Sequence, residues 1–125
     1  MPSPPEESDA ARQLRLVRKA VLLADTTPCF VWEESATRTV RSRCDGLQPS
    51  EVRKLAFEHV RCGGVIRQRR EADEEWFGQR RFDHWYSVCF DVDGIDEPIF
   101  VKIVLHSDDE DYPEARIVGA HKSPR

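Results

Sequence analysis

The chain has 125 residues, of which 39% are hydrophobic and 34% are charged, with four cysteines and a formal net charge of −4. A chain of this length suits one domain with one core, and no apolar run approaches the roughly 18 residues that a membrane span needs. The N-terminus lacks the basic segment and apolar stretch of a secretory signal, so we expect a cytoplasmic protein with no membrane partner.

The acidic residues are unevenly placed along the chain. Eight of the 23 lie in two stretches without Lys or Arg, one in the N-terminal segment and one in a predicted loop: Glu6, Glu7, Asp9, Asp108, Asp109, Glu110, Asp111 and Glu114. Subtracting those eight from 23 leaves 15 acidic residues against 19 Lys and Arg, so the remainder of the chain is basic. The excess of basic residues in the remainder of the chain is compatible with a nucleic-acid partner.

Helices are predicted in the N-terminal half. Residues 1–8 contain three prolines and almost no apolar side chains, which predicts a disordered tail before a single domain at 9–125. Helical spacing of apolar residues predicts a helix over about 10–24, with Asp9 as its N-cap. A short helical stretch is expected from Glu34 to Cys44, and the clearest helix over 49–62. The segment 29–33 fits either a short strand or the lead-in to a helix.

Strands are predicted in the C-terminal half, where the hydrophobic period changes to two. The runs fall at 65–69, about 82–92, 99–106 and 115–121, with a charged loop at 71–79 and a hairpin signal at Asp93-Gly94. Successive strands with short connections predict an antiparallel sheet. We therefore expect an α+β fold, in which N-terminal helices pack on one face of a three- to four-stranded antiparallel sheet.

Alternation assigns the residues of 99–106 to two faces. Ile99, Val101, Ile103 and Leu105 are expected in the core under the helix 49–62, which leaves Lys102 and His106 on the opposite face. A lysine inside such an apolar strand is tolerated where the face is solvated or where an anionic ligand binds. Both interpretations remain open from the sequence.

Further polar residues lie on the neighbouring predicted strands. One of His84 and Tyr86 can join Lys102, depending on register, and both can if they lie near the strand end. In the last strand, alternation places Arg116 and Lys122 on one face and His121 on the other. The sequence thus predicts a sheet with several cations, together with an arginine-rich segment at 67–81.

Metal and cofactor chemistry find no support in the motifs. The four cysteines form no CxxC pair and have no His at the spacing of a zinc site, so we expect reduced thiols and no metal. The chain also lacks a glycine-rich phosphate loop and a serine nucleophile motif. We therefore expect no cofactor.

The remaining constellation of His, Tyr, Lys and Arg suits metal-free RNA cleavage. A base removes the proton of a ribose 2′-hydroxyl, which attacks the adjacent phosphate, and a cation stabilises the charged transition state. The candidate catalytic residues are Tyr86, Lys102, His121, His84, His106 and Arg116. The candidate RNA-binding residues are Arg67, Arg69, Arg70, Arg80, Arg81 and Lys122, although a run of arginines is also typical of a solvated face.

Several motifs resemble those of the MqsR and RelE-like toxin superfamily over about residues 35–122. They are SATRTVRSRCDGLQPSEVRKLAFEHV, HWYSV, PIFVKIVL and ARIVGAHK, in that order. The resemblance implies a compact α+β domain that cleaves mRNA, free or on the ribosome, and that a cognate antitoxin protein inhibits. It implies that Lys102 is the strand lysine, Tyr86 the aromatic after the loop, and Arg116, His121 and Lys122 the cationic end of the last strand.

The chain departs from the family pattern in two respects. Phe100 stands where the family has a tyrosine two residues before the strand lysine, and the net charge is negative, whereas such toxins are usually basic. Two hypotheses follow. The first is a metal-independent endoribonuclease toxin in which His84, Tyr86, His106 or His121 replaces the missing hydroxyl. The second is a non-catalytic regulatory domain on the same scaffold that binds RNA or protein.

Overall fold

The computed structural model describes residues 7–71 and 82–124. The described elements are three α-helices, two 3-10 turns and five strands in the order α1-η1-β1-η2-α2-α3-β2-β3-β4-β5. Of the predicted tail, residues 1–6 lie outside the described residues. Glu7 and Ser8, the last two residues of the predicted tail, contact the first helix: Glu7 forms an ion pair with Arg15, and the Ser8 side chain accepts a hydrogen bond from the Ala11 amide.

Helix α1 spans Asp9–Leu22 and continues into the 3-10 turn η1, Leu23–Asp25. Its N-cap is Ser8, whose side chain accepts a hydrogen bond from the Ala11 amide, so the predicted cap at Asp9 was wrong by one residue. Asp9 is instead the acidic residue of the first turn, where it complements the helix dipole. Buried residues at helical spacing, Leu16, Val17, Ala20 and Val21, attach the helix to the core.

The other helical segments follow the short strand β1, Phe30–Trp32. They are η2 (Glu34–Thr39), α2 (Val40–Arg43) and α3 (Pro49–Arg61). A capping box between Gln48 and Glu51 starts α3, and Gly63 with φ +88° follows its end. The predicted helices at 34–44 and 49–62 are therefore present, although the first is mostly 3-10.

The sheet contains five strands in the order β1-β5-β4-β3-β2. Strands β2 (Arg67–Arg70), β3 (His84–Phe90), β4 (Ile99–Ser107) and β5 (Glu114–Lys122) pair antiparallel. Strand β1 instead pairs parallel with β5, with Phe30 opposite Ala115. The α+β fold is confirmed, but the sheet is mixed and has one strand more than predicted, because the ambiguous segment 29–33 joins its edge.

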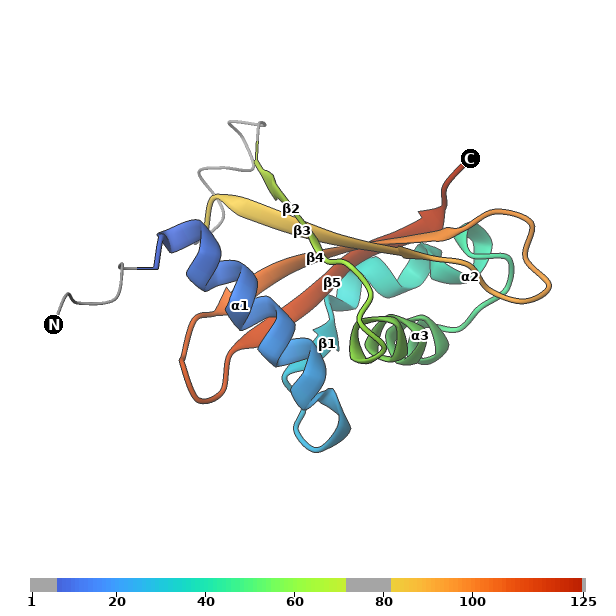
Figure 1. The fold of residues 1–125 in the computed structure, drawn as a ribbon. Helices are drawn as coiled ribbons and strands as arrows, with labels where there is room; N and C mark the ends of the chain where they lie inside the picture. The colour runs from blue at the N-terminus through green and yellow to red at the C-terminus, as the bar shows by residue number, and fades with distance from the viewer. Residues whose placement is uncertain (1–6, 72–81, 125) are drawn as a thin grey trace, which may run out of the picture.

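Helices α1 and α3 cover the same face of this sheet (Figure 1). The side chains beneath them are buried, and in β4 they are the predicted Ile99, Val101, Ile103 and Leu105. Helix α1 contacts β4 and β5, whereas α3 contacts β1 and β3. The predicted burial of these β4 residues is thus confirmed, although the helix with the main contacts to β4 is α1 rather than the predicted α3.

The acidic loop between β4 and β5 is held by α1. Arg12 binds Asp108 at 3.1 Å and Glu110 at 2.9 Å, and Arg15 binds Glu110 at 3.1 Å. Lys19 donates to the Glu110 carbonyl. Hydrogen bonds from Arg15 and Arg12 lower the pKa of Glu110. Much of the acidity seen in the sequence is therefore neutralised within the molecule.

Candidate nucleic-acid interface

The sheet has a second face, which we call the open face. Tyr86, Val88 and Phe90 of β3 are buried toward the helices, so the alternate residues of that strand point the other way. The register then defines the open face across β2 to β5. Among the described elements, no helix covers it (Figure 1). Its members include Arg67, Arg69, Trp85, Ser87, Cys89, Phe100, Lys102, Arg116, Gly119 and His121.

An irregularity in β5 brings Arg116 and His121 onto this one face. Ile103 pairs with Ile117, but its neighbour Lys102 pairs with Gly119. Strand β5 therefore contains one extra residue, Val118, between the partners of these two β4 residues. The alternation of β5 side chains between the two faces therefore reverses after Val118. Ala120 faces the core, whereas His121 lies on the open face. The prediction that Arg116 and His121 lie on opposite faces was wrong for this reason.

A row of aromatic rings and one cation crosses the open face. The ring of His121 stacks on Phe100 with centroids 5.2 Å apart, and Phe100 meets Trp85 edge to face at 6.4 Å. The Lys102 ammonium lies 4.7 Å from the centroid of the Trp85 ring. We call these four residues the Lys102–His121 row. Aromatic faces beside a cation are the groups that bind unpaired bases and phosphates.

The tautomer of His121 follows from its hydrogen bond. Its Nδ1 lies 2.8 Å from the carbonyl oxygen of Lys122. A carbonyl oxygen accepts only, so Nδ1 carries the hydrogen and donates it. In the neutral ring Nε2 is then the unprotonated nitrogen, which is the form that a general base requires.

Two arginines of β2 extend the open face. Arg67 pairs with Ser87 and Arg69 pairs with Trp85, and both arginines are exposed. Arg67 therefore lies in register with Ser87 and Lys102. This places predicted RNA-binding residues beside the Lys102–His121 row.

A second charged cluster occupies the end of the open face next to β1. The Arg116 guanidinium donates to Glu114 at 2.9 Å and to Glu33 at 3.2 Å, and His106 Nε2 lies 3.5 Å from Glu114. Desolvation lowers the pKa of Arg116, but its bonds to Glu114 and Glu33 outweigh that effect and raise it. Arg116 and His106 thus share the face with Lys102, and both contact carboxylates.

Other predicted site residues lie elsewhere. Tyr86 is fully buried on the helix face, where its hydroxyl contacts the Gln68 amide at 3.1 Å. Burial raises the pKa of this hydroxyl, and the bond from Gln68 partly opposes the rise. His84 and its partner Arg70 share that side by alternation. The register therefore excludes Tyr86 and His84 from the face that carries Lys102.

The remaining predicted RNA-binding residues are separated from the row. Lys122 pairs with Ile99 and lies 3.7 Å from Asp45 and 3.8 Å from Asp96, on the core side of the strand end. Arg80 and Arg81 lie outside the described residues. Of the six predicted RNA-binding residues, the structure therefore places Arg67 and Arg69 on the open face.

Sequence reasoning missed two members of the row. Phe100 was interpreted only as the residue that replaces a catalytic tyrosine, and Trp85 was not among the candidate site residues. Their alternation with the buried Tyr86, Val101 and Ile99 is the signal that places both on the open face. They supply stacking surface rather than acid or base chemistry.

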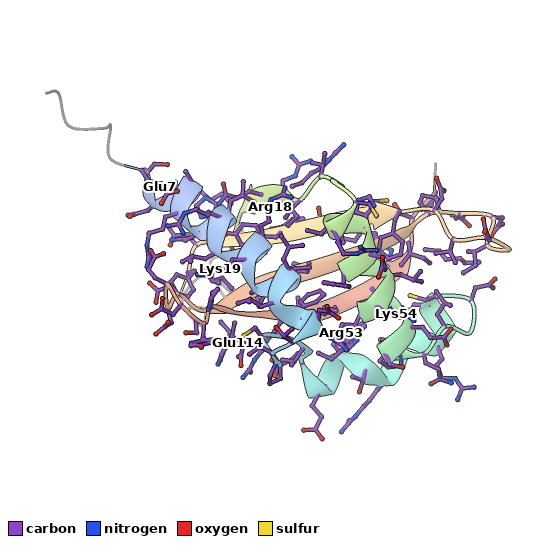
Figure 2. The ribbon with its side chains drawn as sticks, turned by 60° about the horizontal axis from the view of Figure 1, so that its bottom comes forward. Glu7, Arg18, Lys19, Arg53, Lys54 and Glu114 are labelled. Carbon is purple, nitrogen blue, oxygen red and sulfur yellow. The ribbon has the colours of Figure 1, made fainter. Side chains whose placement is uncertain are left out.

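The helix layer offers a different kind of surface. Figure 2 shows Arg18 and Lys19 on α1, and Arg53 and Lys54 on α3. A groove of about 530 Å³ lies beside β1, and its lining contains one charged side chain, Arg53, among residues 24, 26–28, 30–32 and Ser50. It lacks a base next to a cation, so it suits proton transfer less well than the open face does.

Two further properties bear on the site. Among residues 7–71 and 82–124, no three His, Cys, Asp or Glu side chains are grouped as metal ligands. None of the helices described combines the length and apolar character needed to cross a bilayer.

Comparison of the chain with protein-family models, with curated proteins and with solved structures gives no match.

Proposed function

We propose that this chain binds single-stranded RNA on the open face of its sheet and cleaves it without a metal ion, as the toxin of a toxin-antitoxin pair. The observation that carries the proposal is the Lys102–His121 row, in which a base, two aromatic rings and a cation are contiguous. Unpaired bases stack on Trp85 and Phe100, because flat rings on an exposed sheet accept bases that are not held in a duplex. Arg67 and Arg69 hold the phosphates of the flanking nucleotides.

The proposed reaction is transesterification within the RNA. Neutral His121 accepts the proton of a ribose 2′-hydroxyl at Nε2, and the 2′-oxygen forms a bond to the adjacent phosphorus. Lys102 stabilises the negative charge that builds up on the phosphate oxygens. The bond to the 5′-oxygen breaks, and this oxygen takes a proton from water. The products are a 2′,3′-cyclic phosphate and a 5′-hydroxyl.

In the proposed reaction, the stacked ring of Phe100 orients the imidazole of His121. A phenyl ring cannot transfer protons, but it restricts the imidazole to one orientation while Lys122 fixes its tautomer. Phe100 in place of the family tyrosine is then compatible with RNA cleavage, because His121 accepts the proton.

The test is a cleavage assay with purified protein and a labelled single-stranded RNA in excess EDTA. We expect wild type to produce fragments with cyclic phosphate ends, His121→Ala to lose about 100-fold or more in single-turnover rate, and Lys102→Ala to lose at least about tenfold. A matched duplex should resist cleavage. Growth arrest on expression, relieved in the same two variants, tests the toxin role; equal toxicity of all three proteins would place the active site elsewhere.

A non-catalytic RNA-binding domain is the second candidate. The observation that favours it is that Tyr86 is buried and Phe100 has no hydroxyl, so the Lys102–His121 row contains no tyrosine hydroxyl that could act as acid or base. Under this alternative the wild type binds single-stranded RNA but leaves it intact, and Lys102→Ala weakens binding. The cleavage assay and a binding titration on the same RNA separate the two candidates.

A further inference from the structure

Gly119 lies in the interior of β5, at the centre of the proposed site. It is the register partner of Lys102 and lies two residues before His121 on the same face. A glycine inside a strand lowers stability, because it packs no side chain and loses more backbone entropy on folding than other residues. Such a glycine usually has a local reason, such as a bulge or the close approach of another group.

The backbone does not require glycine at this position. The positive φ values of the described chain belong to other residues, so Gly119 adopts a conformation open to any L-residue. The extra residue of the irregularity is Val118 rather than Gly119.

Packing does not require glycine either. A Cβ built on Gly119 meets no atom of the described residues within 4 Å. A Cβ on Gly64 would instead lie 2.4 Å from the His59 ring, where packing does exclude a side chain. Above Gly119 there is therefore a space that the described side chains leave unfilled.

The surroundings of this space are asymmetric. Lys102 has Ser87 on one side and Gly119 on the other, and Ser87 is only 5% exposed. The Lys102 ammonium lies over the Trp85 ring, toward β3, whereas on the other side of Lys102 a Cβ on Gly119 would meet no atom of the described residues within 4 Å. His121 is diagonal to Lys102 across the two strands, at a typical Cβ separation of about 7–8 Å or slightly less, so both side chains border the same space.

We propose that the space above Gly119 is the subsite for the scissile phosphate of the RNA, and that Gly119 is a positioning residue because it lacks a side chain. This inference rests on the proposed function. The phosphate fits this place because it links two nucleotides whose bases stack on Trp85 and Phe100, while Lys102 faces its oxygens and His121 faces the 2′-hydroxyl. A side chain at position 119 would displace the phosphate from both groups.

The test is a graded series, Gly119→Ala and Gly119→Val, with Ser123→Val as the matched control. Ser123 follows the end of β5, so its replacement adds the same side chain four residues away. Single-turnover cleavage of a labelled single-stranded RNA is measured together with the melting temperature. We expect Gly119→Val to lose at least about tenfold in rate, Gly119→Ala to lose less, and the control to match wild type.

Melting temperature separates a blocked site from a damaged fold. Because the added Cβ meets no atom of the described residues within 4 Å and the φ is ordinary, Gly119→Ala should melt at or above the temperature of wild type, and Gly119→Val, in a strand that favours β-branched residues, should melt close to it. An active wild type with an equally active Gly119→Val variant would overturn the subsite while leaving the proposed function standing. A rate loss accompanied by an equal loss of stability would also overturn it. A wild type that neither binds nor cleaves RNA would overturn the proposed function itself, and the subsite with it.

Discussion

Phe100 and His121 face each other across β4 and β5, with ring centroids 5.2 Å apart and ring planes inclined by 24°. The imidazole is therefore held from two sides, by the phenyl ring and by the bond from Nδ1 to the Lys122 carbonyl. A base held in this way loses little orientational entropy when substrate binds.

Removing the base and removing its support should have different effects. We expect His121→Ala to lower the single-turnover rate about 100-fold or more, in the usual range for general-base catalysis. Phe100→Leu should lower the rate less, because Nε2 remains present but is less well oriented. Rapid-quench kinetics at saturating RNA measures both. A Phe100→Leu loss as large as that of His121→Ala would contradict the supporting role.

Lys102 should contribute charge rather than packing. We expect Lys102→Ala to reduce the salt dependence of RNA affinity by about one phosphate contact and the cleavage rate by at least about tenfold, because both depend on the ammonium charge. Lys102→Arg is the control, since it keeps the charge and can still lie over the Trp85 ring. Binding titrations at several salt concentrations test this, and an unchanged slope in Lys102→Ala would show that Lys102 faces no phosphate.

Local patterns predicted the elements, but long-range pairing determined the site. Alternation in 99–106 correctly separated Val101 and Ile103 from Lys102, because every residue of that segment follows a strict period of two. In the last strand, strict alternation failed at Val118, because one extra residue exchanges the faces on which the following side chains lie. The one local signal is Gly119 inside the strand, and it does not identify which residue is extra, because the irregularity arises from the register with β4.

The parallel strand β1 could not be predicted from the sequence, for a similar reason. Three residues carry too little periodicity to identify a strand, and Phe30–Trp32 is ordered by pairing with β5, more than 80 residues later. Its addition brings Glu33 next to Arg116. Of the two carboxylates that bind this predicted catalytic arginine, Glu114 is close in the sequence, whereas Glu33 could be assigned only once the fold was known.

Tyr86 should affect stability and leave the chemistry unchanged. Its buried hydroxyl contacts Gln68, whose amide also donates to the Ala10 carbonyl at 2.7 Å. We expect Tyr86→Phe to lower the free energy of unfolding by about 1 kcal/mol, the usual net worth of one such hydrogen bond. Urea denaturation measures this change. A lower cleavage rate in Tyr86→Phe with no loss of stability would indicate that the Tyr86 hydroxyl takes part in the reaction.

The contacts of Glu110 with α1 should make stability depend on pH in the acid range. Its folded pKa is lowered from the usual 4.5, chiefly by hydrogen bonds from Arg15 and Arg12, so its contribution is present above pH 4.5. That contribution is lost as the pH falls through the folded pKa, because the unfolded chain then binds the proton more readily.

The corresponding measurement compares melting temperatures of wild type and Glu110→Gln between pH 7 and pH 3. We expect wild type to melt higher at neutral pH and the gap to close below about pH 4.5. Glu97→Gln in the loop between β3 and β4 is the control, because it removes the same charge away from Arg12 and Arg15. A gap that stays constant over this range would show that the carboxylate charge contributes nothing.

Binding of RNA on the open face is measured as affinity for a single-stranded RNA whose 2′-hydroxyls are methylated, so that it cannot be cleaved. Trp85→Leu and Phe100→Leu remove a stacking ring from that face, whereas Tyr112→Leu removes an aromatic that is 66% exposed in the acidic loop. We expect each of the first two to weaken binding by about 5-fold to 100-fold, the usual worth of one stacked base, and Tyr112→Leu to bind like wild type. Wild-type affinity in both Trp85→Leu and Phe100→Leu would contradict the open face as the RNA site.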